Sequence, residues 1–253
     1  MRPYILAESN WKTIKDQSVE LVVLPWGATE AHNYHLPYST DIIEAERMAA
    51  ESARIAWDHE ARVIVLPAVP FGVNTGQADI KLDINLNPST QFAVLKDITG
   101  SIYRQGVRKL LIVNGHGGND FKQMLRELGQ LYPGIFVVTC NWFQISEKSA
   151  FFDNVGDHAD EMETSLMQFL APTLVLPLDK AGNGHGKKFR IKALNEPWAW
   201  SERKWSKVTA DTGVGDPSKA NPEKGERFFN EVTRKISDLM IEMARADVEN
   251  LYE

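Results

Sequence analysis

Two apolar runs of this chain end in the same way, and this repetition limits the folds that are open to it. Residues 21–26 lead through a small-residue turn to Glu30 and His32, and residues 109–113 lead within three positions to His116. Short runs rich in Val, Ile and Leu are typical of strands covered on both faces, as in parallel sheets. Because α/β proteins keep their chemistry at the carboxyl ends of such strands, we expect both strand ends to share one site.

Apolar strand patterns alternate with helical patterns along the chain. Strands are predicted at 19–25, 62–66, 109–113 and 135–140. Helices are predicted at Asp41 to about Trp57, Ser89–Gln105, Phe121–Leu131, from near Ala159, and Pro222 to Leu251. This alternation predicts an α/β protein, a three-layer αβα sandwich with a mainly parallel central sheet. No linker or low-complexity tract interrupts the pattern, so residues 1–253 are expected to form a single domain.

Composition excludes several classes of partner. A formal net charge of -6 argues against nucleic-acid binding, which needs a basic surface to neutralise phosphates. No apolar run approaches the roughly 20 residues that cross a bilayer. The first residues lack the apolar core of a signal peptide, so a cytoplasmic enzyme is expected. The single cysteine, Cys140, excludes an internal disulfide and follows an apolar run, so we expect it to be a packed strand residue rather than a nucleophile.

Four residues near the two strand ends have the side chains of a hydrolytic metal site: Glu30, His32, Asp41 and His116. Any one of them alone would usually be a solvated or hydrogen-bonded loop residue, but four together favour a metal site. The Glu-x-His spacing places both side chains on one face of an extended segment. The Asp41 carboxylate can then bridge two cations, an arrangement that deprotonates a water near neutral pH.

Several ordered motifs resemble those of the creatininase (creatinine amidohydrolase) family. They are Gly27–His32, His35–Pro37 with Thr40–Asp41, Asn114–Asn119, His158–Ser165, and Gly213–Ala220 with Glu223–Gly225. The resemblance implies a creatininase-like fold and a metal-dependent hydrolase of non-peptide or cyclic amide C–N bonds acting on a small-molecule amide. It also implies two divalent metal ions per subunit, with zinc preferred and manganese or iron as alternatives, and a homo-oligomer, commonly a hexamer.

The resemblance also assigns the metal ligands. It implies metal binding by Glu30, His32, Asp41 and His116, with Asp41 as the bridge. Creatininase has a further metal-binding glutamate two positions after the histidine of the second motif, where this chain has Gly118. Glu163, which aligns with a glutamate that the family keeps near the metals, is expected to be both the fifth ligand and a catalytic residue. On a helix Glu161 and Glu163 point about 200° apart, so only one of them should face the site.

His158 matches the histidine that acts on the substrate's ring nitrogen in creatininase. We expect hydroxide held by the cations to attack the carbonyl and His158 to protonate the departing nitrogen. The N–H groups of Gly117 and Gly118 are expected to stabilise the oxyanion. Asn74 and His185 lie in loops that are expected to line the substrate pocket, although an exposed position for His185 is an equal alternative.

The substrate stays open at this point. Creatininase uses a tryptophan four positions before the catalytic histidine, and Asn154 stands there in this chain, which weakens creatinine itself as the substrate. The alternatives are a formamide deformylase acting on a pyrimidine nucleotide and a peptidase of a modified peptide. The basic segment 187–192 would suit a phosphorylated substrate, although a solvated strand edge is favoured.

A non-enzymatic alternative is a metal-binding structural protein. His158 and Glu163 argue against it, because a purely structural site needs no proton donor beside the metals. The tryptophans Trp198, Trp200 and Trp205 cluster after Pro197 and are expected to form an active-site flap or an oligomer contact.

Overall fold

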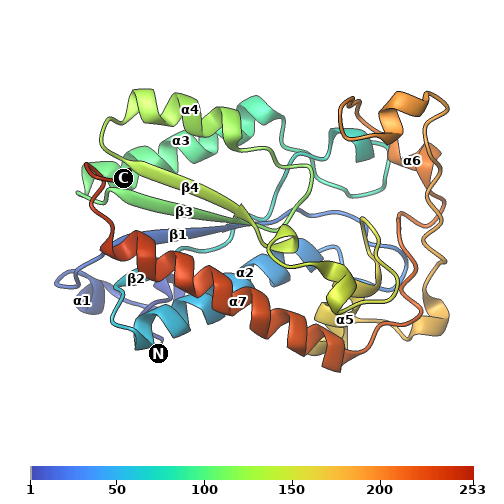
Figure 1. Cartoon of the computed structure of the whole chain (residues 1–253), viewed down its shortest axis with the longest axis horizontal. Helices are drawn as coiled ribbons and strands as arrows, with labels where there is room; N and C mark the ends of the chain where they lie inside the picture. Colours follow the sequence, from blue (N-terminus) through green and yellow to red (C-terminus); the bar gives the residue numbers. More distant parts are fainter. Residues whose placement is uncertain (1) are drawn as a thin grey trace.

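Four parallel strands form the centre of the computed structural model, which describes residues 2–253 (Figure 1). They are β1 (Leu21–Trp26), β2 (Val63–Val65), β3 (Lys109–Asn114) and β4 (Phe136–Asn141). Their order across the sheet is β2-β1-β3-β4, and every neighbouring pair is parallel. The predicted strands therefore lie within a residue or two of the observed ones.

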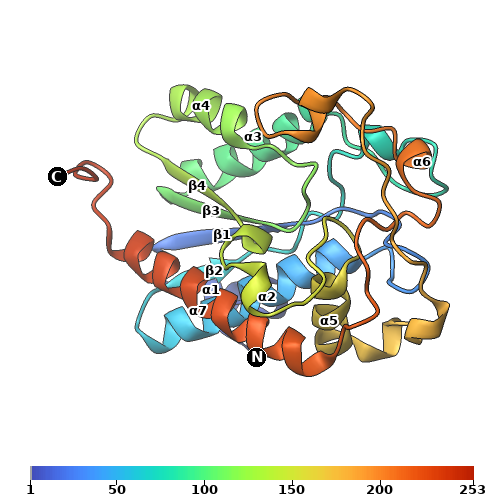
Figure 2. The ribbon, with the colours of Figure 1, turned by 45° about the vertical axis from the view of Figure 1, so that its right-hand side comes forward.

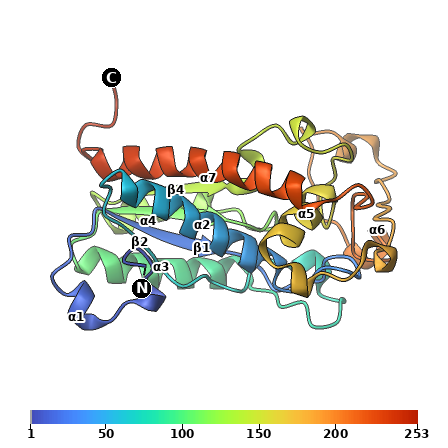
Figure 3. The ribbon, with the colours of Figure 1, turned by 90° about the horizontal axis from the view of Figure 1, so that it is seen from below.

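Helices cover both faces of this sheet, as expected for three layers. One face packs against α2 (Thr40–Asp58) and α7 (Pro222–Arg245), with α5 (Glu161–Leu170) against these two helices, and the other face packs against α3 (Pro88–Arg104) and α4 (Lys122–Leu131). Figures 2 and 3 show α2 and α7 side by side on the first face. In β1, Leu21 and Val23 enter one core while Val22 and Leu24 enter the other, because successive strand residues point to opposite sides. The three-layer prediction is confirmed.

The chain also contains the short helices α1 (Trp11–Ile14) and α6 (Trp205–Val208) and seven single-turn 3-10 helices between residues 6 and 195. The prediction for the last helix was too long. It ends at Arg245, and Ala246 turns to an extended conformation with a ψ of 140°. Ala244 is the last of its buried residues, so no core surface remains to support a further turn. None of the described helices is long and apolar enough to span a membrane.

The order of the strands determines where a ligand site is expected. The chain passes from β1 to β2 on one side of β1 and later returns to β3 on the other side. The crevice outside the carboxyl ends of β1 and β3 lies at this reversal, where open α/β sheets bind ligands. Glu30 and His32 follow β1, and His116 follows β3.

Candidate metal centre

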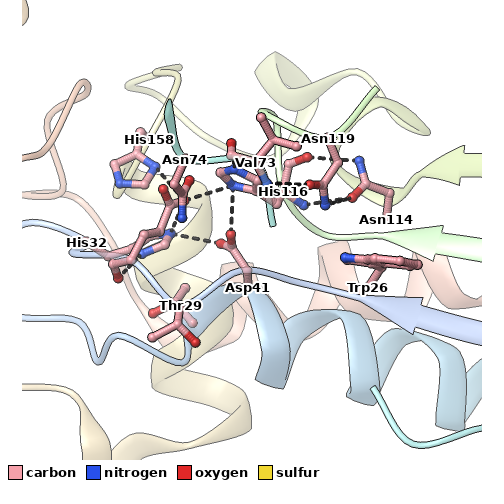
Figure 4. Close-up of polar contacts among 12 residues, drawn as sticks. Trp26, Thr29, His32, Asp41, Val73, Asn74, Asn114, His116, Asn119 and His158 are labelled. Carbon is pink, nitrogen blue, oxygen red and sulfur yellow. Dashed lines mark hydrogen bonds and ion pairs between the residues drawn. The ribbon is translucent and has the colours of Figure 1, made fainter. Parts of the chain in front are cut away.

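The polar residues that follow β1 and β3 meet in one buried cluster with the first turn of α2 (Figure 4). His32 Nε2 lies 2.9 Å from Asp41 Oδ1, and His116 Nδ1 lies 3.0 Å from Asp41 Oδ2. His116 Nδ1 also lies 2.9 Å from Glu30 Oε1. The structure thus brings together four residues that the sequence places up to 86 positions apart (Glu30 to His116).

Three sets of three side chains among residues 2–253 can each hold one cation, and two of these sets share Asp41. The first of the two is Glu30, Asp41 and His116, and the second is His32, Asp41 and Glu163; the remaining set is Glu30, His32 and His158. Within each set, one ligand atom per residue lies within 4.8 Å of the others. Asp41 turns a different oxygen toward the histidine of each of its two sets. This geometry suits a carboxylate that bridges two cations.

Backbone carbonyls orient three histidines of the cluster. One ring nitrogen of each lies at hydrogen-bond distance from such an oxygen: His32 Nδ1 from Glu30, His116 Nε2 from Val73 and His158 Nε2 from Ala31, at 3.2, 3.0 and 2.9 Å. Because a carbonyl only accepts, that nitrogen carries the proton in each neutral ring. The other nitrogen faces the carboxylates, where it can bind a metal or exchange a proton.

Two further polar residues hold the segment after β1. Gln77 donates a hydrogen bond to Glu30 Oε2, which leaves Oε1 directed at His116. Asp83 Oδ1 accepts a hydrogen bond of 2.8 Å from the N–H of Ala31. Neither role was predicted from the sequence, although Gln77 lies three positions after Asn74, in the loop that was expected to line the pocket.

Glu163 lies in the first turn of α5, and the structure brings it into the cluster. Its Oε2 accepts a hydrogen bond of 2.5 Å from the N–H of Ala159, a residue in the left-handed region with a φ of 50°. Glu161 points elsewhere: its carboxylate accepts from the N–H of Asn154 and from Lys224. The two glutamates thus point in different directions, as the helical geometry predicts. Glu163 is the one that lies beside His32 and Asp41.

In the metal-free protein, bound protons compensate the negative charge of the buried carboxylates. Burial lowers the pKa of His32, but the neighbouring Asp41 carboxylate outweighs burial and raises it to about 10. Burial opposes protonation of His116 too, yet Glu30 and Asp41 raise its pKa well above the ordinary value. Burial raises the pKa of Glu163 to about 8. The centre therefore accommodates positive charge, whether as protons or as cations.

The donor atoms of this cluster fit divalent cations. His32 Nε2 and Asp41 Oδ2 are buried and make no aligned hydrogen bond, although each lies close to an oppositely charged atom. Two imidazole nitrogens and three carboxylates converge without full hydrogen bonding, which is unfavourable in a buried site unless a cation joins them. A mixed nitrogen and oxygen donor set suits zinc, manganese or iron.

A further carboxyl group lies beneath the cluster. Glu44 is fully buried one turn after Asp41 on α2, and neither of its carboxyl oxygens has a hydrogen-bond partner within residues 2–253. Burial and the charge of Glu163 raise the pKa of Glu44 well above its ordinary value, which favours a neutral acid. This buried acid was not predicted from the helical pattern of the sequence.

A cavity of about 1100 Å³ opens onto the cluster. Its lining includes Asn74, Gly117, Gly118 and His158, four of the residues that the sequence assigned to substrate binding or proton transfer. His185 is exposed and does not line this cavity, so the structure does not bring it to the cluster. The basic segment 187–192 also lies outside the lining.

The position of Gly118 admits no larger residue without movement. A Cβ atom there would collide with the Val73 carbonyl oxygen and lie 3.2 Å from His116 Cδ2. The backbone of this turn thus excludes the glutamate that creatininase has two positions after its histidine. Glu163 forms a ligand set with His32 and Asp41 that does not include His116.

A profile of the creatininase family, described as creatinine amidohydrolase, matches residues 7–240. The chain belongs to the creatininase family. It is 44% identical to a creatinine amidohydrolase candidate from Bacteroides fragilis NCTC 9343, whose crystal structure superposes over 100% of both chains with a TM-score of 0.94.

Characterised relatives are more distant and differ in activity. The mycofactocin precursor peptide peptidase of Mycolicibacterium smegmatis is 26% identical over 87% of this chain and 84% of its own length. Creatinine amidohydrolase of Pseudomonas putida is 24% identical over 94% of this chain and 96% of its own length. Creatininase structures of a Zn–Zn type and a Mn form share the fold, at 22% identity and a TM-score of 0.78 over 96% of this chain and 99% of theirs. The family is therefore confirmed, and its members act on different substrates.

Proposed function

We propose that the protein hydrolyses a non-peptide or cyclic amide C–N bond with two divalent cations. One cation is held by Glu30, Asp41 and His116, and the other by His32, Asp41 and Glu163. The observation that carries this proposal is that Asp41 belongs to both ligand sets and directs one oxygen to each histidine. Zinc is the preferred metal, with manganese or iron as alternatives.

Two cations held by these ligands would supply Lewis acidity and would lower the pKa of a coordinated water. The chain's own residues then direct the protons. His158 is buried, and burial lowers its pKa, so the imidazole is neutral. Its Nε2 proton is held by the Ala31 carbonyl, so its bare Nδ1, 3.8 Å from Glu30 Oε1, accepts the proton of the attacking water. The same nitrogen returns this proton to the departing amine.

The turn after β3 supplies hydrogen-bond donors for the oxyanion. The N–H groups of Gly117 and Gly118 make no hydrogen bond within residues 2–253, and both glycines line the cavity. Gly117 has no neighbouring atom within 4 Å of where a Cβ would lie, so a ligand can approach its backbone closely. Donors preorganised in this way stabilise charge that develops in the transition state.

A peptidase of a modified peptide is the second candidate. The cavity of about 1100 Å³ exceeds the roughly 300–1000 Å³ that encloses a drug-sized molecule, so it can take a substrate much larger than a single small ring. The relationship to the mycofactocin precursor peptide peptidase supports the same class. A formamide deformylase acting on a nucleotide receives less support, because the basic segment 187–192 does not line the cavity.

The proposed function is tested with protein that has been stripped of metal and reloaded with zinc or manganese. Cyclic amides, formamides and short peptides are incubated with it, and amide cleavage is followed by mass spectrometry. We expect cleavage of at least one class, its loss in Asp41→Asn, and no change in Asp58→Asn, an exposed position at the other end of α2. Cleavage that persists after metal removal would contradict the proposal.

The homo-oligomer, the cytoplasmic location and the single domain over residues 1–253 stay predictions. Trp198 and Trp200 expose 74% and 85% of their surface, which is consistent with an intermolecular contact. Light scattering of the purified protein measures the number of subunits.

A further inference from the structure

Residues 200–206, called the 200–206 segment, form part of the cavity wall beside His158. The segment is attached at both of its ends. Glu202 accepts a hydrogen bond from Thr75, and Ser206 donates one of 2.5 Å to Asp79. Arg203 forms an ion pair of 2.6 Å with Asp157, the residue before His158. The segment therefore connects the 75–79 region to the loop that carries His158.

Trp205 is the residue of this segment that contacts the His158 ring. It is 6% exposed, and the two ring centroids lie 5.3 Å apart with planes at 89°. The Arg203 guanidinium covers the Trp205 ring, 4.4 Å from its centroid, and the indole N–H donates a 2.9 Å hydrogen bond to the Thr212 carbonyl. Trp205 is thus fixed by groups other than His158.

The other contacts of His158 restrain all of the residue except one direction in which its ring can rotate, and Trp205 lies on that side. The His32 ring stacks against it at 4.1 Å, and the Ala31 carbonyl holds Nε2. Its backbone pairs with Val214 through hydrogen bonds of 3.0 and 2.8 Å. These contacts fix the backbone, one ring nitrogen and one face. Trp205 closes the space into which the ring would otherwise rotate and lose the Ala31 hydrogen bond.

We propose that Trp205 is a positioning residue that holds the His158 imidazole with Nδ1 directed at the reacting atoms, and that the Arg203–Asp157 pair fastens Trp205 in place. This inference rests on the proposed role of His158. The ion pair has side chains that are 37% and 56% exposed, so it contributes little to stability and its effect is geometric. Because the 200–206 segment also lines the cavity, it links the shape of the substrate pocket to the alignment of the proton-transfer group.

The test compares the zinc-loaded wild type with Trp205→Leu, Trp205→Phe and Arg203→Gln. Trp11→Leu is the matched control, because Trp11 is a 77% exposed tryptophan that does not line the cavity. With the best amide found in the screen, Trp205→Leu should lower kcat about 10- to 100-fold while KM changes less than about 3-fold. Trp205→Phe should keep most of the wild-type kcat, and Arg203→Gln should lower kcat less than Trp205→Leu does. The zinc content of all three variants should stay that of the wild type.

A second readout does not depend on turnover. In ¹⁵N-histidine NMR spectra of the zinc-loaded protein, His158 should be the Nε2–H tautomer in the wild type and in Trp205→Phe, and a mixture of tautomers in Trp205→Leu. A wild-type kcat in Trp205→Leu, a change confined to KM, or an unchanged His158 tautomer would overturn the proposal. If the wild type cleaves no amide, the proposed function fails, and the tautomer alone then decides whether Trp205 positions His158.

Discussion

The two oxygens of Asp41 face two different histidines, Oδ1 at 2.9 Å from His32 Nε2 and Oδ2 at 3.0 Å from His116 Nδ1. His32 follows β1 and His116 follows β3, so Asp41 joins the ends of two neighbouring strands from the first turn of α2. This position makes Asp41 the residue on which both proposed cation sites depend.

Metal binding should release protons. In the metal-free protein the pKa of His32 is raised to about 10 and that of His116 well above 6.5, so both rings are protonated at pH 7. Glu163, whose pKa burial raises to about 8, is protonated at pH 7 as well. The cations must displace these three protons to reach their ligand atoms, which gives a release of about three protons per subunit when both sites fill. Isothermal titration calorimetry with zinc in buffers of different ionisation enthalpy measures this number. Binding without proton release would show that the histidines are not the ligands.

Gly118→Ala should destabilise the turn after β3, because its Cβ would collide with the Val73 carbonyl and the His116 ring. We expect a loss of about 1–3 kcal/mol in the free energy of unfolding and weaker metal binding. Gly117→Ala is the matched control for stability, since no atom lies within 4 Å of its Cβ position. Urea denaturation of both variants checks this, and equal stabilities would contradict the assigned crowding at Gly118.

The fold was largely predictable because its determinants are local. The apolar runs that became β1 and β3 are short and buried on both faces, and the polar residues directly after them lie at the strand ends. Asp41 could be assigned to the same site because it lies at the start of the helix that follows β1, eleven positions after Glu30. The predicted end of α7 was wrong, because the sequence does not reveal where the core beneath a helix stops.

The individual contacts that come from long loops could not be predicted. Gln77 and Trp205 reach the cluster through segments whose paths depend on tertiary contacts. For Trp205 the sequence predicted an active-site flap or an oligomer contact, and the structure places it in the cavity wall against His158. Glu44 is polar on the buried face of α2, where helical periodicity alone predicts an apolar residue. Glu163 was accessible to prediction only through the resemblance to the family and the angle between it and Glu161.

Glu44→Gln should stabilise the metal-free protein more at pH 8 than at pH 5.5. Because the pKa of Glu44 in the folded state is raised above its ordinary value of 4.5, the folded protein binds a proton that the unfolded chain releases as pH rises. The wild type therefore loses stability above about pH 4.5 through this group, and the glutamine variant does not.

Urea denaturation at both pH values measures this difference. Glu46→Gln, an exposed position on the same helix, is the control and should change stability equally at the two pH values. A Glu44→Gln variant that is destabilised by the same amount at both would show that the buried acid is ionised.

Glu163→Gln should separate the two cation sites. Only the set of His32, Asp41 and Glu163 loses a ligand, so we expect about one of two bound zinc ions to be retained, with turnover reduced at least about 100-fold. Glu161→Gln is the isosteric comparison on the same helix turn, and its zinc content should stay that of the wild type because its carboxylate contacts Asn154 and Lys224 instead. The number of zinc ions per subunit, measured by plasma mass spectrometry in both variants, shows which of the two glutamates is a metal ligand.

The most direct test of the bridging role of Asp41 is anomalous diffraction at the zinc edge from crystals of the zinc-loaded protein. Two peaks about 3.5–4 Å apart are predicted, with the Asp41 carboxylate between them, Glu30 and His116 on one ion, and His32 and Glu163 on the other. A single peak, or two ions that do not share Asp41, would contradict the account.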